Sequence, residues 1–349
     1  MNKLLTMCLT ALLGLTSASL AEEAGTSEAE GGIAQTRQYQ ACILQMVSRA
    51  NGAVLVSEIR GKCSAQKNRQ IDDDILASRR REEQLAITSR RALVPHKRNF
   101  LMPATYTVNP KEKPIPPALS NFAPIEDIDN IEMKFQLSLK YQFAKSVLMR
   151  DDRFHFAFTS LSFWQAYNSD ASAPFRETNY EPEVFWTAPV EFQPLSMLGI
   201  DASEVAVGFS HQSNGQSGTL SRSWNRVYAK FTWESGKWVF GLKPWYRIRE
   251  DEKQNVLDAD GDDNPDIEKY MGHFEFRSTY RTDNHELSMM LRNNLRSENH
   301  GAVQLDWTFP IWRGLSGHAQ YFNGYGESMI DYNQRVERFG LGLILSDLY

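Results

Sequence analysis

Residues 131–143 read IEMKFQLSLKYQF, and apolar and polar side chains alternate along the whole stretch. The odd positions, from Ile131 to Phe143, hold large apolar or aromatic residues, whereas the even positions hold Glu, Lys, Gln and Ser. Successive side chains of a β-strand point to opposite faces, so this stretch predicts a strand with one apolar and one polar face. Such a strand fits a soluble sandwich with an apolar interior, or a barrel whose apolar face meets lipid.

Similar segments recur along the chain, and the lengths of the links between them favour the barrel. We expect twelve strands, at about 98–108, 131–144, 153–167, 176–190, 201–213, 222–233, 238–249, 269–281, 286–296, 302–310, 316–323 and 334–349. Tight links such as 234–237 alternate with long polar ones such as 250–268. Short turns at one end and long loops at the other are typical of transmembrane β-barrels. Residues 98–349 are therefore predicted to form an all-β, transmembrane antiparallel barrel.

The first 21 residues have the features of a secretory signal peptide. Lys3 precedes an apolar stretch at residues 4–15, and Ser19-Leu20-Ala21 offers a small-x-small cleavage pattern. We expect the mature protein to lie in the outer membrane of a Gram-negative-type cell. The mean hydropathy of -0.46 and the lack of an apolar run of 18 residues after the signal argue against a helical membrane protein.

Residues 22–97 are predicted to be a small α-helical extension on the periplasmic side. Residues 36–63 suggest two short helices around Asn51-Gly52, and a Cys42–Cys63 disulfide would join them in this exported chain. The remainder, residues 64–97, is rich in charge and predicts a solvated helix or linker. Removing Lys3 with the signal changes the formal net charge from -5 to -6, which argues against a nucleic-acid partner.

Residues 205–228, VAVGFSHQSNGQSGTLSRSWNRVY, place a histidine and a serine two positions apart on a strand pattern. His211 and Ser213 share the parity of the apolar residues before them, and Asn225 shares that of the apolar residues on the next strand. In a barrel this face meets lipid, where unpaired polar groups are strongly disfavoured. Two interpretations follow from the residues: ordinary loop residues at a strand end, or a nucleophile, a base and an orienting amide.

Five motifs extend this pattern and resemble the outer membrane phospholipase A family, in order and at family-like spacing. They are HQSNGQSGTLSRSWNR, PFRETNYEPEVF (174–185), KPWY (243–246), DDNPDIEKYMG (262–272) and GYGESMIDYN (324–333). The resemblance covers about residues 90–349. It implies a twelve-stranded barrel that hydrolyses the acyl esters of phospholipids (phospholipase A1, A2 and lysophospholipase activity), requires Ca²⁺ and is active as a homodimer.

The resemblance also assigns roles to individual residues. Ser213 would be the nucleophile, His211 the base and Asn225 the orienting residue, with the Gly215 amide helping to stabilise the oxyanion.

A calcium site is implied as well, built from the Ser221 hydroxyl, the backbone carbonyl of Gln216, and Ser172 of the partner subunit. The family carries a basic residue where this chain has Gln216, but a carbonyl ligand does not depend on its side chain. Ser160 stands where the family commonly has a glutamine facing the partner, so we expect a weaker dimer.

Other polar positions are given structural roles. Residues 258–263 resemble the start of a calcium loop but are off register, and Glu327 and Asp331 are expected to order a long loop. Charges on the polar strand faces are expected to form a network in the lumen: Glu132, Lys134, Lys140, Arg226 and Lys230. Such a network argues against a passive porin, which is the main alternative function.

A barrel acyltransferase is the other alternative function. It would pass the acyl group to a lipid instead of water.

Overall fold

The structure is a computed structural model, which describes residues 79–80, 83–85, 93–108, 128–170, 173–190, 201–253, 255, 258, 261–282, 284–312 and 315–346. The chain divides into two units, Met1–Asp72 and Asp73–Tyr349, and all described residues belong to the second unit. The predicted signal peptide, the helical hairpin and the Cys42–Cys63 pair lie outside these ranges and stay predictions. Within the ranges, no helix has the length and apolarity needed to cross a membrane.

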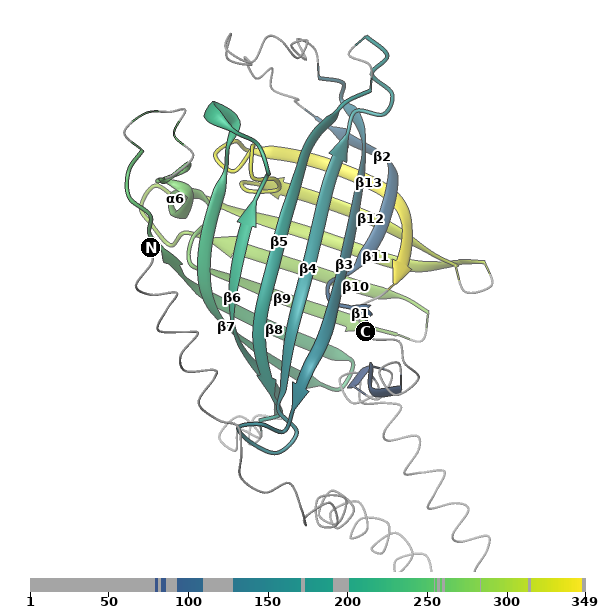
Figure 1. The fold of residues 1–349 in the computed structure, drawn as a ribbon. Helices are drawn as coiled ribbons and strands as arrows, with labels where there is room; N and C mark the ends of the chain where they lie inside the picture. The colour runs from purple at the N-terminus through teal and green to yellow at the C-terminus, as the bar shows by residue number, and fades with distance from the viewer. Residues whose placement is uncertain are drawn as a thin grey trace, which may run out of the picture. The chain divides into compact units, whose positions relative to one another are not determined.

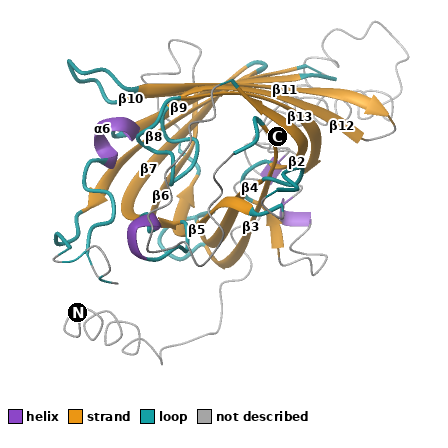
Figure 2. Cartoon of the chain, turned by 90° about the horizontal axis from the view of Figure 1, so that it is seen from above, coloured by secondary structure: helices purple, strands orange, loops and turns teal. Residues whose placement is uncertain are grey.

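Twelve antiparallel strands form a closed barrel, and Figure 2 shows them from above around one interior. They are β2 (Asn99–Thr107), β3 (Ile131–Lys145), β4 (Arg153–Trp164), β5 (Phe175–Ala188), β6 (Asp201–Ser213), β7 (Ser223–Ser235), β8 (Trp238–Ile248), β9 (Phe274–Arg281), β10 (Glu286–Asn293), β11 (Gly301–Trp312), β12 (Leu315–Gly324) and β13 (Val336–Ser346) (Figure 1). Each pairs with its neighbour in chain order, and β13 pairs with β2 to close the ring. The predicted all-β barrel and its strand number are confirmed.

One predicted strand began too early. The sequence suggested a strand over 269–281, but the helix α6 (Ile267–Met271) precedes β9. Ile267 and Met271, four residues apart, are both buried, which is the spacing of one helical face. Gly272 then turns the chain with a φ of 65°, and a Cβ there would lie 2.4 Å from the carbonyl oxygen of Asn293. The turn therefore requires glycine and ends the helix before β9 can begin.

Residues before the predicted barrel boundary also contact the wall. The short strand β1 (Leu93–Pro95) pairs with residues 139–141 of β3, beyond the part of β3 that pairs with β2. Glu83, which lies farther upstream, forms a 2.8 Å ion pair with Lys140 on β3. This part of the N-terminal segment thus lies against the inner side of the wall.

The two faces of the wall differ as the alternation predicts. On β3 the outward residues Ile131, Leu137 and Tyr141 are 46%, 52% and 44% exposed. Their neighbours Glu132 and Lys134 are buried in the lumen. An apolar outer band around a polar interior is the arrangement required of a barrel in lipid.

Ion pairs in the lumen join strands that are next-but-one neighbours in the ring, and join them to the loop before β13. Arg338 on β13 donates to Glu132 on β3 at 2.7 Å and to Glu327 at 2.8 Å. Lys134 reaches the same Glu327 at 2.8 Å, and Arg226 on β7 reaches Glu181 on β5 at 3.0 Å. The lumen is therefore lined by paired charges, and a cavity of about 320 Å³ remains among them.

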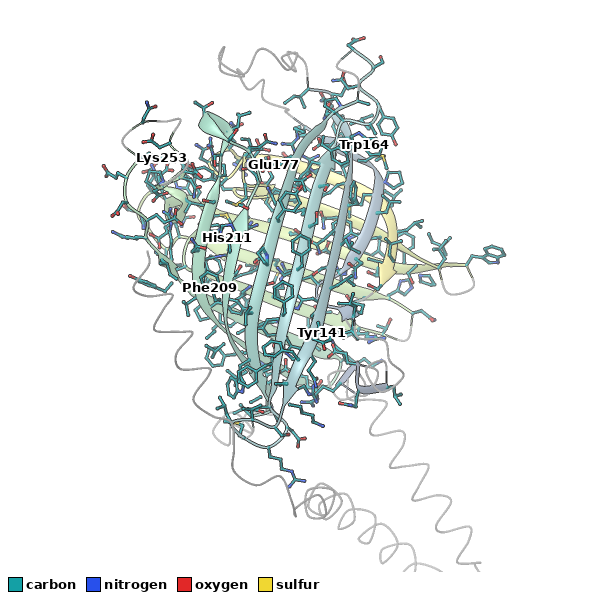
Figure 3. The ribbon with its side chains drawn as sticks, viewed as in Figure 1. Tyr141, Trp164, Glu177, Phe209, His211 and Lys253 are labelled. Atoms are coloured by element: carbon teal, nitrogen blue, oxygen red, sulfur yellow. The ribbon has the colours of Figure 1, made fainter. Side chains whose placement is uncertain are left out.

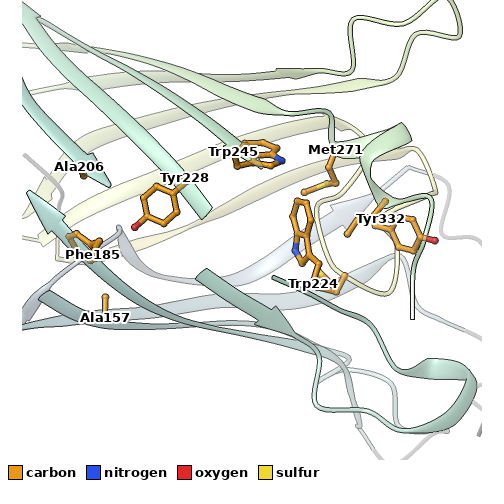
Figure 4. Packing of buried hydrophobic residues seen from close by; sticks show 10 residues of the cluster. Ala157, Phe185, Ala206, Trp224, Tyr228, Trp245, Met271 and Tyr332 are labelled. Carbon is orange, nitrogen blue, oxygen red and sulfur yellow. The ribbon is translucent and has the colours of Figure 1, made fainter. Parts of the chain in front are cut away.

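An apolar cluster lies inside the barrel, next to α6 and the long loops. Figure 4 shows Trp224 and Trp245 beside Met271 and Tyr332. The two indole rings meet edge to face with centroids 6.1 Å apart, and Trp224 Nε1 donates to the Gln212 side chain at 2.9 Å. This packing fixes the ends of β6, β7 and β8 from the inside.

Arg338→Met should destabilise the barrel, because Glu132 and Glu327 lose their shared cation. Among the described residues, these two carboxylates then keep only Arg176 and Lys134 as ion-pair partners. Loss of the sole partner of a buried charge typically costs about 3–5 kcal/mol, and the remaining cations should hold the loss to the lower end of that range. The free energy of unfolding can be measured by urea titration, following the mobility of the folded barrel on unheated gels. As a control, Lys145→Met removes a 3.9 Å pair with Asp151 between half-exposed side chains, and should cost under about 1 kcal/mol. Equal losses in the two variants would show that the lumen pairs are not structural.

Candidate active site

Two neighbouring strands bring polar side chains together near the long-loop end of the barrel. In the register of β6 and β7, His211 lies directly opposite Asn225, and Ser213 lies opposite Ser223. Figure 3 shows His211 on the wall above Phe209. The alternation of apolar residues before His211 keeps β6 extended up to Ser213, so this strand presents both candidate side chains.

All three candidate residues lie on the outer face of the wall. Phe209 on β6 and Val227 on β7, which share their parity, are 41% and 44% exposed. His211, Ser213 and Asn225 are each partly buried among such neighbours. The group therefore faces the surroundings of the barrel and not the lumen.

A hydrogen bond joins two members of the group. His211 Nδ1 lies 2.9 Å from Asn225 Oδ1, and an amide oxygen can only accept, so Nδ1 donates. In the described part of the chain, no hydrogen bond connects Ser213 Oγ to the ring. Ser213 and His211 are two residues apart on one face, a Cα separation of about 7 Å, which a rotamer change can bridge. Catalytic hydrogen bonds are often long before substrate binds.

The loop after Ser213 is folded around Asn214, a residue that sequence reasoning did not single out. Asn214 is buried; its side-chain oxygen accepts the backbone N–H of Arg222 at 2.9 Å, and its amide donates to the Leu220 carbonyl at 2.8 Å. Gly215 follows with a φ of 65°. A Cβ on Gly215 would lie 3.1 Å from the Tyr180 ring, so a larger residue would be strained there. The Asn-Gly dipeptide was the available signal for this turn.

The residues expected to hold calcium are only partly brought together. Ser221 Oγ donates to Asp263 Oδ2 at 2.6 Å, and Ser223 Oγ lies 3.3 Å from the same oxygen. Gln216 is exposed in the loop, and Ser172 lies outside the described residues. Asp263, which also forms an ion pair with Lys253, was not predicted as a site residue. It lies where two sequence signals overlap: the off-register calcium-loop pattern at 258–263 and the motif at 262–272.

The predicted dimer position lies in line with the candidate nucleophile. Ser160 on β4 pairs with Tyr180 on β5, and Tyr180 pairs with Ser213 on β6. Phe158, which shares the parity of Ser160, is exposed on the outer wall and stacks on Tyr180 with ring centroids 6.3 Å apart. One outward row of side chains therefore connects Ser160 to the candidate active site.

Comparison of the sequence with known protein families assigns the chain to one of them. The sequence profile of the family described as Phospholipase A1 matches residues 76–345. The chain belongs to the phospholipase A1 family. Phospholipase A1 of Klebsiella pneumoniae is 35% identical over 257 residues, which are 74% of this chain and 83% of the relative.

Solved structures of relatives share the fold. Outer membrane phospholipase A from Escherichia coli is 35% identical, with a TM-score of 0.65, over 74% of this chain and 99% of that chain. A second structure of that protein is an active-site mutant in which an asparagine is replaced by alanine. The Salmonella typhi outer membrane phospholipase, solved as a dimer with bound calcium, is 34% identical with a TM-score of 0.65, over 74% of this chain and 93% of that chain.

Proposed function

We propose that this protein hydrolyses the acyl ester bonds of phospholipids in the outer membrane, with Ser213 as the nucleophile. The observation that carries the proposal is the His211–Asn225 hydrogen bond next to Ser213 on the outer wall. A nucleophile on this face is beside the acyl chains of its substrate, whereas a lumen site would have to extract the lipid. Family membership supports the reaction class, and the asparagine active-site mutant of the E. coli relative supports a role for Asn225.

The hydrogen bond determines how the three side chains act. His211 holds its proton on Nδ1, so Nε2 of the neutral ring has a free lone pair. Nε2 takes the proton of Ser213 as Oγ attacks the ester carbonyl carbon. His211 then gives this proton to the departing lysophospholipid oxygen, which leaves the acyl group on Ser213. Water, activated by His211 in the same way, releases the fatty acid.

The negative charge that develops on the substrate oxygen needs positive partners. The Gly215 N–H follows the nucleophile and can donate to this oxygen. Calcium prefers oxygen ligands, and the Ser221 hydroxyl next to the Asp263 carboxylate fits that preference. The Gln216 carbonyl would be a further ligand. A bound calcium ion supplies charge that stabilises the oxyanion.

Activity must be controlled, because the nucleophile is always beside lipid. A dimer that completes the calcium site with Ser172 of the partner subunit would provide this control, and a monomer would leave the ion under-coordinated. The calcium-bound dimer of the Salmonella relative supports this arrangement, as does the row from Ser160 to Ser213. We also propose that residues 22–97 are a periplasmic extension, of which Glu83 and residues 93–95 reach the barrel wall.

Ser213→Ala and His211→Ala should each lower hydrolysis below about a tenth of the wild-type rate, because the nucleophile or its base is removed. Asn225→Ala should retain more activity, since it changes ring orientation more than charge. The assay is turnover of a mixed-acyl phosphatidylcholine in detergent micelles, with product analysis that separates A1, A2 and lysophospholipase cleavage and acyl transfer. Ser278→Ala on β9, with an unchanged rate, is the control. If Ser213→Ala forms a folded barrel and still hydrolyses the lipid at a substantial rate, Ser213 is not the nucleophile.

Ser221→Ala should raise the calcium concentration needed for half-maximal rate by about tenfold, because a ligand is lost. Ser172→Ala should act in the same direction. The measurement is a calcium titration of hydrolysis after treatment with a chelator, which itself should abolish turnover. Asp258→Ala serves as the matched control in the acidic loop and should leave the titration unchanged. If the half-maximal calcium concentration changes in Asp258→Ala and not in Ser221→Ala, the ion binds in the acidic loop and not at Ser221.

A further inference from the structure

A carboxylate stands behind the orienting asparagine. Asn225 Nδ2 donates to Glu250 Oε1 at 2.6 Å. Glu250 follows the end of β8 by two residues, and Asn225 pairs with Ile248 near that end. The hydrogen bonds from His211 to Asn225 and from Asn225 to Glu250 therefore form one chain across three neighbouring strands.

The carboxylate determines which way the amide points. A carboxylate can only accept hydrogen bonds, so the Asn225 atom that faces Glu250 must be the NH₂ group. The amide oxygen is then left for His211, whose Nδ1 must carry the proton. If the amide turned over, its NH₂ group would face Nδ1, and the ring proton would move to Nε2. In that tautomer the ring cannot take the proton of Ser213.

The charge of Glu250 also compensates for the lack of charge on Asn225. A neutral amide stabilises the protonated His211 ring less than a carboxylate would. A hydrogen bond to an ionised acceptor is stronger than a neutral one and polarises the amide that donates it. More negative charge on Asn225 Oδ1 stabilises the imidazolium that forms when His211 takes a proton. Glu250 is partly buried, and among the described residues no Lys or Arg forms an ion pair with it. The polar contact that this carboxylate makes within the described residues is the hydrogen bond from Asn225.

We propose that Glu250 is a positioning residue of the active site, which holds the Asn225 amide and through it the His211 tautomer. Glu250 acts through Asn225 and does not touch the substrate. This inference rests on the proposed function, because it assumes that His211 and Asn225 serve Ser213.

The test is a kinetic comparison of Glu250→Ala, Asn225→Ala and the double variant on phosphatidylcholine in mixed micelles. Glu250→Ala should lower kcat about tenfold, as expected for loss of a charge-assisted hydrogen bond, with KM within about twofold of wild type. Glu250→Gln, which keeps the shape and can accept one hydrogen bond, should lower kcat less, about threefold. The double variant should have the same kcat as Asn225→Ala, because Glu250 acts on His211 only through the Asn225 side chain.

Glu252→Ala, an exposed carboxylate two residues further on, is the matched control and should keep wild-type kcat. All variants are checked for barrel mobility on unheated gels, so that a folding defect is separated from a kinetic one. Wild-type kcat in both Glu250 variants would overturn the inference, and so would losses that multiply with Asn225→Ala. If Asn225→Ala and Ser213→Ala themselves remain active, the proposed function fails; if only the Glu250 variants remain active, the positioning role alone fails.

Discussion

A strand that crosses a bilayer must pair every backbone N–H and C=O within the protein, because hydrocarbon offers no partner. Closure of β13 onto β2 meets this demand for the whole sheet. Alternation then sends the large apolar side chains to the lipid and the charges to the interior. The interior charges must in turn be paired, as Arg338 is with Glu132 and Glu327. The wall that results supports the candidate active site.

The three candidate catalytic side chains lie on the outer face of the wall, and this position determines how the proposed reaction would obtain its substrate. In the proposed reaction, the substrate would reach Ser213 from the lipid side, and calcium and water would meet it at the long-loop end. The site lies where these two environments meet, since β6 ends at Ser213 and the loop around Asn214 begins. Polar groups that would be disfavoured deep in hydrocarbon are held in a hydrogen-bonded row from His211 to Glu250. In the mechanism we propose, that row gives a neutral asparagine part of the function that a carboxylate has in other triads.

The barrel could be predicted from the sequence because apolar residues recur at every second position. This period indicates a β-strand and also shows which face of the strand each side chain lies on. The same parity put His211, Ser213 and Asn225 on the outer wall, where the structure has them. It did not reveal α6, because two apolar residues four positions apart are a weak signal within a segment that otherwise alternates. Nor did it show Ser221 beside Asp263 or Asn225 beside Glu250, which are 42 and 25 residues apart. Parity gives the face of a side chain, but the path of a long loop depends on packing.

The role of Ser213 can be tested directly by trapping the nucleophile from the lipid side. Protein in phospholipid vesicles is treated with a lipid-soluble phosphonate ester, a reagent that bonds covalently to activated serines, and the adduct is located by peptide mass spectrometry. We expect one adduct per chain, on Ser213, and its loss in His211→Ala. An adduct on another residue, or labelling of Ser213 that does not depend on His211, would contradict a lipid-facing serine activated by this histidine.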